Sequence, residues 1–411
     1  MLSPFSTISF VALLGLFTAT LSHFSLLDLP MLSSNAARHQ PDLDAPIPAD
    51  RPVDPWFDDA KIGIIVHWGL YSVPGWAPPS GKFGSNPDWK DWFLTAAAPA
   101  NNPYAEWYLW SQTLPDSLTS KHHAATYGPD ADYYETFAPI FANETRSWDG
   151  SVWEKWFRWS GARYVVVTTK HHDGYTLFPP SSPHPQLPPH LSHPPNDLIS
   201  RLMKAFRNPR TPVPHHQRLK VGLYYSGGFD WSFEMGRDVN TWGPLPPKSA
   251  EYASWADEHV RELVNRYKPD VLWGDITYPS SPPSAFVPRL LNDYFRKVPH
   301  GLVNDRWFMQ LDLASAAPRL SNDETYEGDF ITPEYTRYRT IPSRKWETCH
   351  GVGFSFGYNR MEDGDITGSQ GRRELAISAG AEIEGFASVA FNQWGGSIRD
   401  KGVPKEPRGE H

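Results

Sequence analysis

Asp275 is the acidic residue whose place in the sequence points most directly to catalysis. It follows the apolar run of residues 271–273 after a single glycine. An acid placed at the end of a buried run is held rigidly and is partly removed from water, as the nucleophile in glycoside hydrolysis must be. The alternative for an acid at such a position is a helix cap or a salt bridge in a loop.

A glycosidase of this kind also needs a second carboxyl group, which protonates the leaving oxygen. Residues 328–335 contain Asp329 and Glu334. Three further acids lie close by in the sequence, namely Glu324, Glu327 and Glu347. Spacing alone does not choose among these five side chains.

The adjacent residues His171 and His172 suggest a metal site at first sight. Neighbouring residues of an extended segment point to opposite sides, and no cysteine or second histidine pair accompanies them at ligand spacing. We therefore expect neither a metal nor another cofactor, and interpret the imidazoles, with His67, as hydrogen-bond donors to hydroxyl groups of a ligand. A metal-dependent hydrolase that uses His171 and His172 stays as an alternative, which a chelator would test.

The elements that must position these residues form a repeating pattern. Nearly continuous apolar runs predict strands that are buried on both faces, as in a parallel sheet. These runs are residues 62–66, 164–168, 219–225, 271–273 and 301–303. Amphipathic stretches at 198–206 and 256–267 predict helices between them. Because each run ends in residues that ionise or donate hydrogen bonds, we expect an α/β fold of the (β/α)8 barrel type rather than an open doubly wound sheet.

Composition excludes several classes of protein. The net charge is -8, with 46 acidic against 38 basic residues and no basic run, so we expect no nucleic-acid partner. A single cysteine, Cys349, rules out a disulfide framework within the chain. Two proline-rich stretches, residues 178–195 and 208–217, predict surface loops, because proline cannot donate to a ladder or a helix.

The N-terminal residues favour secretion. Residues 9–21 are apolar and uncharged, short for a membrane span and typical of a signal-peptide core. The alternatives are a membrane anchor or an incorrectly assigned start of the chain. We predict a signal peptide over residues 1–22 and a connector over 23–52. The mature protein is then extracellular or in a lysosome-like compartment, with no membrane partner. A sequon at Asn143 is consistent with this prediction.

Eight segments in order carry a resemblance to glycoside hydrolase family 29, the α-L-fucosidases. They are WFDDAKIGIIVHWGLYSVP (56–74), EWY (106–108), KHHDGY (170–175), GLYYSGG (222–228), ELVNRYKPDVLWGD (262–275), NDRW (304–307), KWE (345–347) and SFGYN (355–359). The resemblance covers about residues 54–361, and we predict the catalytic barrel over residues 53–365. It implies a retaining glycosidase that releases fucose from fucosylated oligosaccharides or glycoproteins by a two-carboxylate double displacement.

The resemblance also implies roles for individual residues. Asp275 matches the family's nucleophile, and Glu334 matches its acid/base, with Glu347 as the competing candidate. Seven positions match the lining of the fucose pocket, namely His67, Glu106, Trp107, His171, His172, Tyr225 and Arg306. Trp273 and Phe356 match apolar walls, and Phe356 is placed to pack on the fucose methyl group.

Beyond residue 365 the family pattern is lost. We therefore expect a divergent tail over residues 366–411, without the closing strands, and a barrel that is incomplete at its C-terminal end. An open barrel exposes strand edges and core. This leaves a second functional hypothesis, in which the protein binds fucose but does not turn it over.

Overall fold

The structure is a computed structural model that describes residues 43–79, 102–214, 217–234, 249–279, 287–308, 326–334, 342–351, 355–362 and, for the backbone, 386–390. All of these residues belong to one compact unit, Leu43–His411. The predicted signal peptide and the connector up to residue 42 lie outside the described residues.

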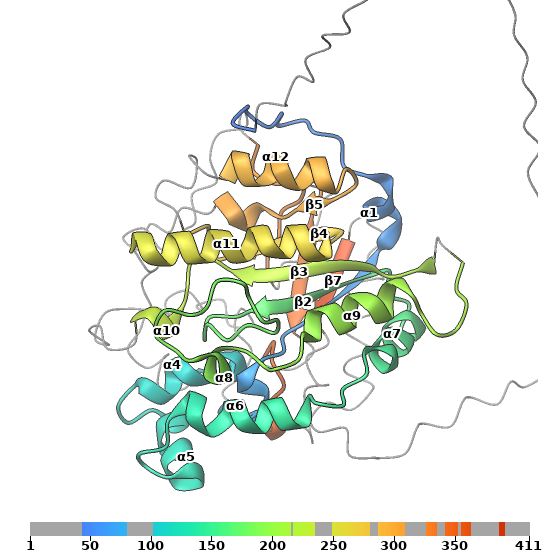
Figure 1. The fold of residues 1–411 in the computed structure, drawn as a ribbon. Helices are drawn as coiled ribbons and strands as arrows, with labels where there is room; N and C mark the ends of the chain where they lie inside the picture. The colour runs from blue at the N-terminus through green and yellow to red at the C-terminus, as the bar shows by residue number, and fades with distance from the viewer. Residues whose placement is uncertain are drawn as a thin grey trace, which may run out of the picture. The chain divides into compact units, whose positions relative to one another are not determined.

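A parallel sheet forms the centre of this unit (Figure 1). Its strands lie in the order β5-β4-β3-β2-β1-β7-β6, and every neighbouring pair is parallel. The strands are β1 (Ile62–Val66), β2 (Tyr164–Lys170), β3 (Lys220–Ser226), β4 (Val271–Asp275), β5 (Leu302–Val303), β6 (Glu347–Gly351) and β7 (Phe386–Ala390). The five apolar runs thus form strands β1 to β5, which confirms the predicted parallel α/β sheet.

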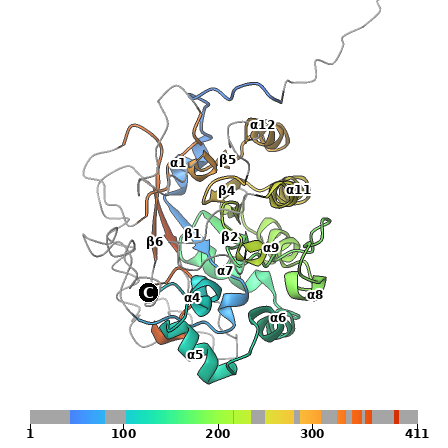
Figure 2. The same cartoon turned by 90° about the vertical axis from the view of Figure 1, so that its left-hand side faces the viewer.

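Helices return the chain between consecutive strands. These are α7 (Gly150–Trp159) before β2, α9 (Leu198–Arg207) before β3, α11 (Ala250–Tyr267) before β4 and α12 (Val287–Lys297) before β5. Helices α9, α11 and α12 lie along one side of the strands (Figure 2). The N-cap side chains of Asp197 and Ser249 accept backbone hydrogen bonds at the starts of α9 and α11. Helix α11 ends where Lys268 turns left-handed before Pro269.

The described residues form six further helices. They are α1 (Pro55–Ala60), α4 (Tyr108–Thr113), α5 (Leu118–Tyr127), α6 (Tyr133–Glu144), α8 (Pro189–Ser192) and α10 (Trp231–Glu234). Single 3-10 turns occur at Leu70–Ser72, Ala105–Trp107, Asp305–Phe308 and Arg360–Glu362.

The strands bury both faces, and alternate residues belong to two separate apolar clusters. In β2, Val165 and Val167 pack in the cluster that contains the crossover helices, whereas Tyr164 and Val166 pack in the second cluster. This alternation follows from the period of two in an extended strand. It explains why the strands read as continuous apolar runs.

The seven named strands do not close into a ring. Isolated parallel bridges instead place residues 330–334 between the two edge strands: Phe330 pairs with Asn304 beyond β5, and Ile331 pairs with Trp346 before β6. The backbone amide of Asp329 also donates to the carbonyl of Val303 at 2.7 Å. The predicted parallel fold is therefore confirmed, whereas the predicted eight-strand barrel is not formed by the named strands.

The expectation of a tail without strands is wrong for residues 386–390. This segment forms β7, which pairs with β1 on one side and β6 on the other. Its sequence, FASVA, contains two alanines and a serine and is too weakly apolar to stand out as a buried strand. The rest of the predicted tail, residues 366–385 and 391–411, lies outside the described residues.

The second proline-rich stretch is mostly exposed, as predicted. The first contains the short helix α8 and is exposed only in part, because the side chains of Phe178, His184 and Leu191 are buried. His184 bonds to Ser232 at 2.8 Å. Among the helices that the structure describes, none has the length and apolar character that crossing a membrane requires.

Candidate active site

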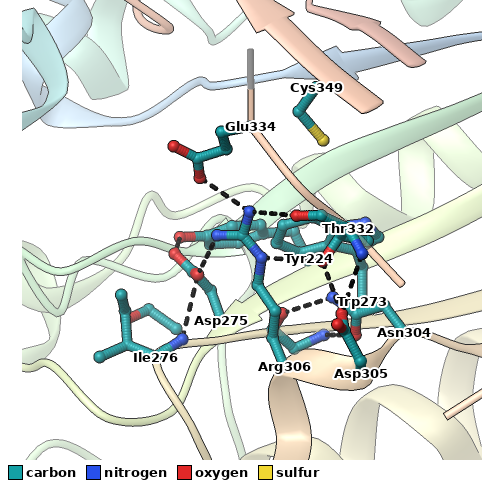
Figure 3. A network of polar contacts seen from close by, with 12 residues as sticks. Tyr224, Trp273, Asp275, Ile276, Asn304, Asp305, Arg306, Thr332, Glu334 and Cys349 are labelled. Atoms are coloured by element: carbon teal, nitrogen blue, oxygen red, sulfur yellow. Dashed lines mark hydrogen bonds and ion pairs between the residues drawn. The ribbon is translucent and has the colours of Figure 1, made fainter. Parts of the chain in front are cut away.

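The predicted polar residues lie at one end of the sheet, where the carboxyl ends of the first five strands meet. His67 follows β1, His171 and His172 follow β2, Asp275 ends β4, and Arg306 lies in the 3-10 turn after β5. Because all five strands are parallel, residues far apart in the sequence meet at this end of the sheet. Asp275 and Arg306 are in direct contact there (Figure 3).

Asp275 is held by donors on both of its carboxylate oxygens. The hydroxyl of Tyr224 donates to Oδ2 at 2.5 Å, and His172 Nε2 lies 3.9 Å from the same oxygen. Arg306 Nη1 and the backbone amide of Ile276 both donate to Oδ1 at 3.0 Å. The side chain is only 9% exposed, so these contacts hold the carboxylate in a single orientation.

Arg306 joins Asp275 to Glu334. While Nη1 binds Asp275, Nη2 donates to Oε1 of Glu334 at 2.7 Å (Figure 3). Burial acts to lower the pKa of Arg306, but the carboxylates of Glu334 and Asp275 outweigh it and raise that pKa above its usual value. The Glu334 side chain is 38% exposed, so this second carboxylate reaches solvent whereas Asp275 is enclosed.

Glu347, the competing candidate for the acid, lies in a different environment. It is the first residue of β6 and is fully buried. The hydroxyl of Tyr164 donates to Oε2 at 2.6 Å, and Trp273 Nε1 donates to Oε1 at 3.0 Å. Burial raises the pKa of this carboxyl group, and the donors around it act in the opposite direction.

The remaining acidic candidates are occupied elsewhere or not described. Asp329 accepts from Arg51 Nη1 at 2.7 Å and from the backbone amide of Val303 at 2.8 Å. Glu327 forms an ion pair with Arg344 at 3.5 Å. Glu324 lies outside the described residues.

The three predicted histidines pack against one another. The rings of His171 and His172 lie 3.9 Å apart, and His67 lies 5.4 Å from His171. Burial lowers the pKa of His67 to about 3, although the Asp275 carboxylate opposes that shift. Burial also lowers the pKa of His171 and of His172 well below the usual range. All three imidazoles are therefore uncharged at neutral pH, which suits them to bind hydroxyl groups.

Glu106, Trp107 and Phe356 form a wall beside these histidines. Phe356 stacks on His67 with ring centroids 5.4 Å apart, and Trp107 meets His172 edge to face at 5.6 Å. Glu106 accepts from the backbone amides of Phe356 and Gly357, at 3.3 and 2.7 Å. Burial raises the pKa of Glu106 to about 7.

Tyr225 is the one predicted site residue that the structure places elsewhere. Its hydroxyl lies 3.4 Å from His259 Nδ1, and its ring belongs to the cluster that packs against the crossover helices. Tyr224 faces Asp275 instead. The alternation of an extended strand shows that only one of the two tyrosines can face the site, but the sequence does not say which.

Trp273 packs against both side chains that hold Asp275. Its ring stacks on Tyr224 with centroids 5.3 Å apart and an interplanar angle of 18°. The guanidinium carbon of Arg306 lies 4.9 Å from the Trp273 ring centroid. The predicted apolar wall is thus also a support for the carboxylate.

The turn after Asp275 is strained. Ile276 and Thr277 have φ values of 56° and 72°, which β-branched residues rarely adopt. The backbone amide of Thr277 donates to the Arg306 carbonyl, and that of Gly227 donates to the Asp275 carbonyl, both at 3.0 Å. These contacts hold the turn in a conformation that aims the Ile276 amide at the Asp275 carboxylate.

The assembled site combines an enclosed carboxylate, an exposed carboxylate on the same guanidinium, uncharged imidazoles and aromatic walls. Such a set can bind an uncharged ligand that carries hydroxyl groups and an apolar edge. The two carboxylates can act as nucleophile and proton donor. Among the described residues, no three His, Cys, Asp or Glu side chains gather in a way that could hold a metal ion.

Sequence matches of this chain lie in one protein family. A sequence profile of the α-L-fucosidase family matches residues 32–371. The tissue α-L-fucosidase of Bos taurus is 31% identical over 356 residues, a match that covers 82% of this chain. The chain spans 62% of the length of the curated relatives that it matches at this level.

Solved structures agree with the sequence match. One α-L-fucosidase is 36% identical, with a TM-score of 0.66, and the match covers 84% of this chain and 71% of that one. The α-fucosidase of Thermotoga maritima in complex with fucose is 34% identical, with a TM-score of 0.61, over 84% of this chain and 69% of that one.

Proposed function

The chain belongs to the α-L-fucosidase family, and from this premise we propose that it is a retaining α-L-fucosidase. Its substrates are fucosylated oligosaccharides or glycoproteins. Asp275 is the nucleophile and Glu334 is the acid/base. The related Thermotoga maritima enzyme has been crystallised with fucose, which supports fucose as the sugar that this site accepts.

One observation carries the proposal: a single guanidinium group, that of Arg306, binds both Asp275 and Glu334. The distance between the two carboxylates is consequently no more than the length of two hydrogen bonds plus the width of one guanidinium group. Retaining glycosidases place their carboxyl groups about 5 Å apart, so that one reaches the anomeric carbon and the other reaches the leaving oxygen.

The two steps follow from this arrangement. First, a carboxylate oxygen of Asp275 attacks the anomeric carbon, the bond from that carbon to the leaving oxygen breaks, and Glu334 gives its proton to that oxygen. Glu334 then takes a proton from water, the water oxygen attacks the same carbon, and Asp275 leaves as a carboxylate. Two inversions at one carbon retain its configuration.

The remaining side chains fit the shape and polarity of the sugar. The uncharged imidazoles of His67, His171 and His172 bind the fucose hydroxyl groups. Phe356 packs on the methyl group of fucose. An apolar ring at this place favours a 6-deoxy sugar over a sugar with a hydroxymethyl group.

We extend the proposal to the fold and to the compartment. The segment 330–334 takes the place of an eighth strand and closes a (β/α)8-type barrel between β5 and β6; the bridges at Phe330 and Ile331 support this. We also propose that the protein is secreted and carries a glycan at Asn143, which is exposed in the last turn of α6.

Hydrolysis of an aryl α-L-fucoside tests the activity, with NMR to identify the anomer that forms first. We expect α-L-fucose as the first product. β-Fucose as the first product would contradict retention. Fucose binding without release of the aryl group would favour the binding-protein hypothesis, and loss of activity with a chelator would favour the metal-dependent one.

Asp275→Asn tests the nucleophile, because an amide cannot form the glycosyl ester. This variant should fold and lose nearly all turnover. Asp293→Asn on α12 is the matched control, since Asp293 is also buried but pairs with Arg296 and Lys297, away from the site. Substantial turnover by folded Asp275→Asn would overturn the assignment.

A further inference from the structure

Glu347 is a carboxylate inside the sheet for which the proposed reaction has no use. Its side chain is fully buried, and its oxygens accept from three donors. These are the Tyr164 hydroxyl at 2.6 Å, Trp273 Nε1 at 3.0 Å and, more weakly, the Cys349 thiol at 3.6 Å. A buried carboxylate costs free energy unless it is well paired, so its presence here calls for a role.

The bond to Trp273 connects Glu347 to the nucleophile. The indole has one polar atom, Nε1, and its bond to Glu347 sets the rotation of the ring. The ring in turn stacks on Tyr224 and lies against Arg306. Those two side chains donate to the two different oxygens of Asp275.

We propose that Glu347 is a positioning residue that acts through Trp273: it orients the indole ring against which Tyr224 and Arg306 pack, and so sets the geometry of the Asp275 carboxylate. The proposal rests on the proposed function, since it assigns Glu347 a part in the same reaction. In this role Glu347 contacts neither the sugar nor the reacting atoms.

The surroundings of Glu347 disfavour a proton-transfer role. Its carboxyl has no exposed surface, whereas the Glu334 side chain is 38% exposed. Both of its oxygens already accept hydrogen bonds from the protein. A general acid must reach the leaving oxygen of a substrate that enters from solvent, and an occupied, enclosed carboxylate cannot do so without breaking these bonds.

Two substitutions at Glu347 separate the alternatives. Glu347→Leu keeps the approximate size but removes both acceptors, and we expect kcat to fall on the order of 10²-fold with KM little changed. Glu347→Gln keeps an oxygen that accepts from Trp273 and places an amide beside the Tyr164 hydroxyl, so kcat should stay close to the wild-type value. A glutamine cannot transfer a proton, so equal inactivity of the two variants would overturn the proposal.

Trp273→Phe removes the same hydrogen bond from the other side. If Glu347 acts through this bond, the double variant Glu347→Leu/Trp273→Phe should be no slower than the slower single variant. Losses of kcat that multiply would show that the two residues act independently and would overturn the proposal.

Glu154→Leu on α7 is the matched control for loss of a buried glutamate. Glu154 is 3% exposed and pairs with Arg158 at 2.8 Å, in a helix away from the site. This variant should lower the thermal midpoint and leave kcat per folded molecule unchanged. If Glu347→Leu behaves like it, Glu347 is merely structural and the proposal fails.

Failure of the proposed function gives a different result. If the wild-type protein does not release fucose at all, positioning is measured from the Kd of a fucose-shaped iminosugar, whose ring ammonium pairs with Asp275. Glu347→Leu should then weaken binding at least tenfold while Glu347→Gln should not. Equal Kd values for all three proteins would overturn the positioning role.

Discussion

Tyr224 donates a hydrogen bond of 2.5 Å to Oδ2 of Asp275, while its neighbour Tyr225 points to the opposite face of β3. This pair of adjacent tyrosines offers an internal control. Tyr224→Phe should lower kcat roughly 10²-fold, since one fixed donor to the proposed nucleophile is lost. Tyr225→Phe removes the equivalent hydroxyl group on the other face of β3 and should leave kcat nearly unchanged. Steady-state kinetics on an aryl fucoside measure both, and similar losses in the two variants would contradict the assignment of faces.

The proposed acid/base role of Glu334 predicts that activity depends on the leaving group. Glu334→Ala should slow fucosides with poor leaving groups most, because activated aryl groups need little protonation. Added azide should restore turnover of an activated substrate, since the anion attacks without a base. Glu327→Ala, a nearby acid paired with Arg344, should show neither effect. If azide restores Glu347→Ala and not Glu334→Ala, the two glutamates exchange roles.

Gly228 has no room for a side chain. A methyl group at this position would lie 1.6 Å from the carbonyl oxygen of Ile276, in the strained turn after Asp275. Gly228→Ala should therefore displace the turn, lower the free energy of unfolding by at least about 3 kcal/mol and abolish most turnover. Gly128→Ala is the control, because Gly128 also resists substitution through its φ of 111° but has open space around it. That variant should lose about 1–2 kcal/mol and keep its kcat.

The lowered pKa of His259 predicts a specific dependence of the unfolding free energy on pH. Burial lowers its pKa to about 3, while the carbonyl of Ser182 opposes the shift. A histidine in the unfolded chain titrates near pH 6.5, so between these values only the unfolded state binds the proton. The stability that the neutral imidazole provides is full above pH 6.5 and is lost as pH falls toward 3.

His259→Gln should accordingly reduce the slope of unfolding free energy against pH by up to about 1.4 kcal/mol per unit between pH 6 and 4. Urea denaturation at several pH values measures this slope. The same substitution at exposed His190 should leave it unchanged. An unaltered slope in His259→Gln would show that this imidazole takes up its proton in the folded state.

Much of the sheet could be predicted because its strands are buried on both faces. The run 62–66 stands out by its apolar side chains, and the structure forms β1 over Ile62–Val66. Strand β7 could not be found in this way. Its five residues include two alanines and a serine, and it forms where neighbouring strands provide backbone partners on both sides.

The candidate site was predictable where a residue directly follows a strand. Asp275, His67 and His171 lie at strand ends, and parallel strands bring such ends together. The contact between Arg306 and Glu334 could not be inferred, because Arg306 lies in a short 3-10 turn and Glu334 in a segment of isolated bridges, and no sequence periodicity describes the path of either. The choice between Tyr224 and Tyr225 likewise depends on how β3 is rotated in the sheet, which a single apolar run leaves open.

The place of β7 in the sheet has a consequence for synthesis of the protein. One edge of β1 pairs with β2, but the other pairs with residues 387–389, so nearly the whole described chain must leave the ribosome before β1 acquires its second neighbour. Until then the backbone groups along one edge of β1 are unpaired and its apolar side chains are incompletely covered, and both attract other nascent chains. Ribosome stalling or premature termination ahead of residue 386 should consequently give chains that depend on chaperones.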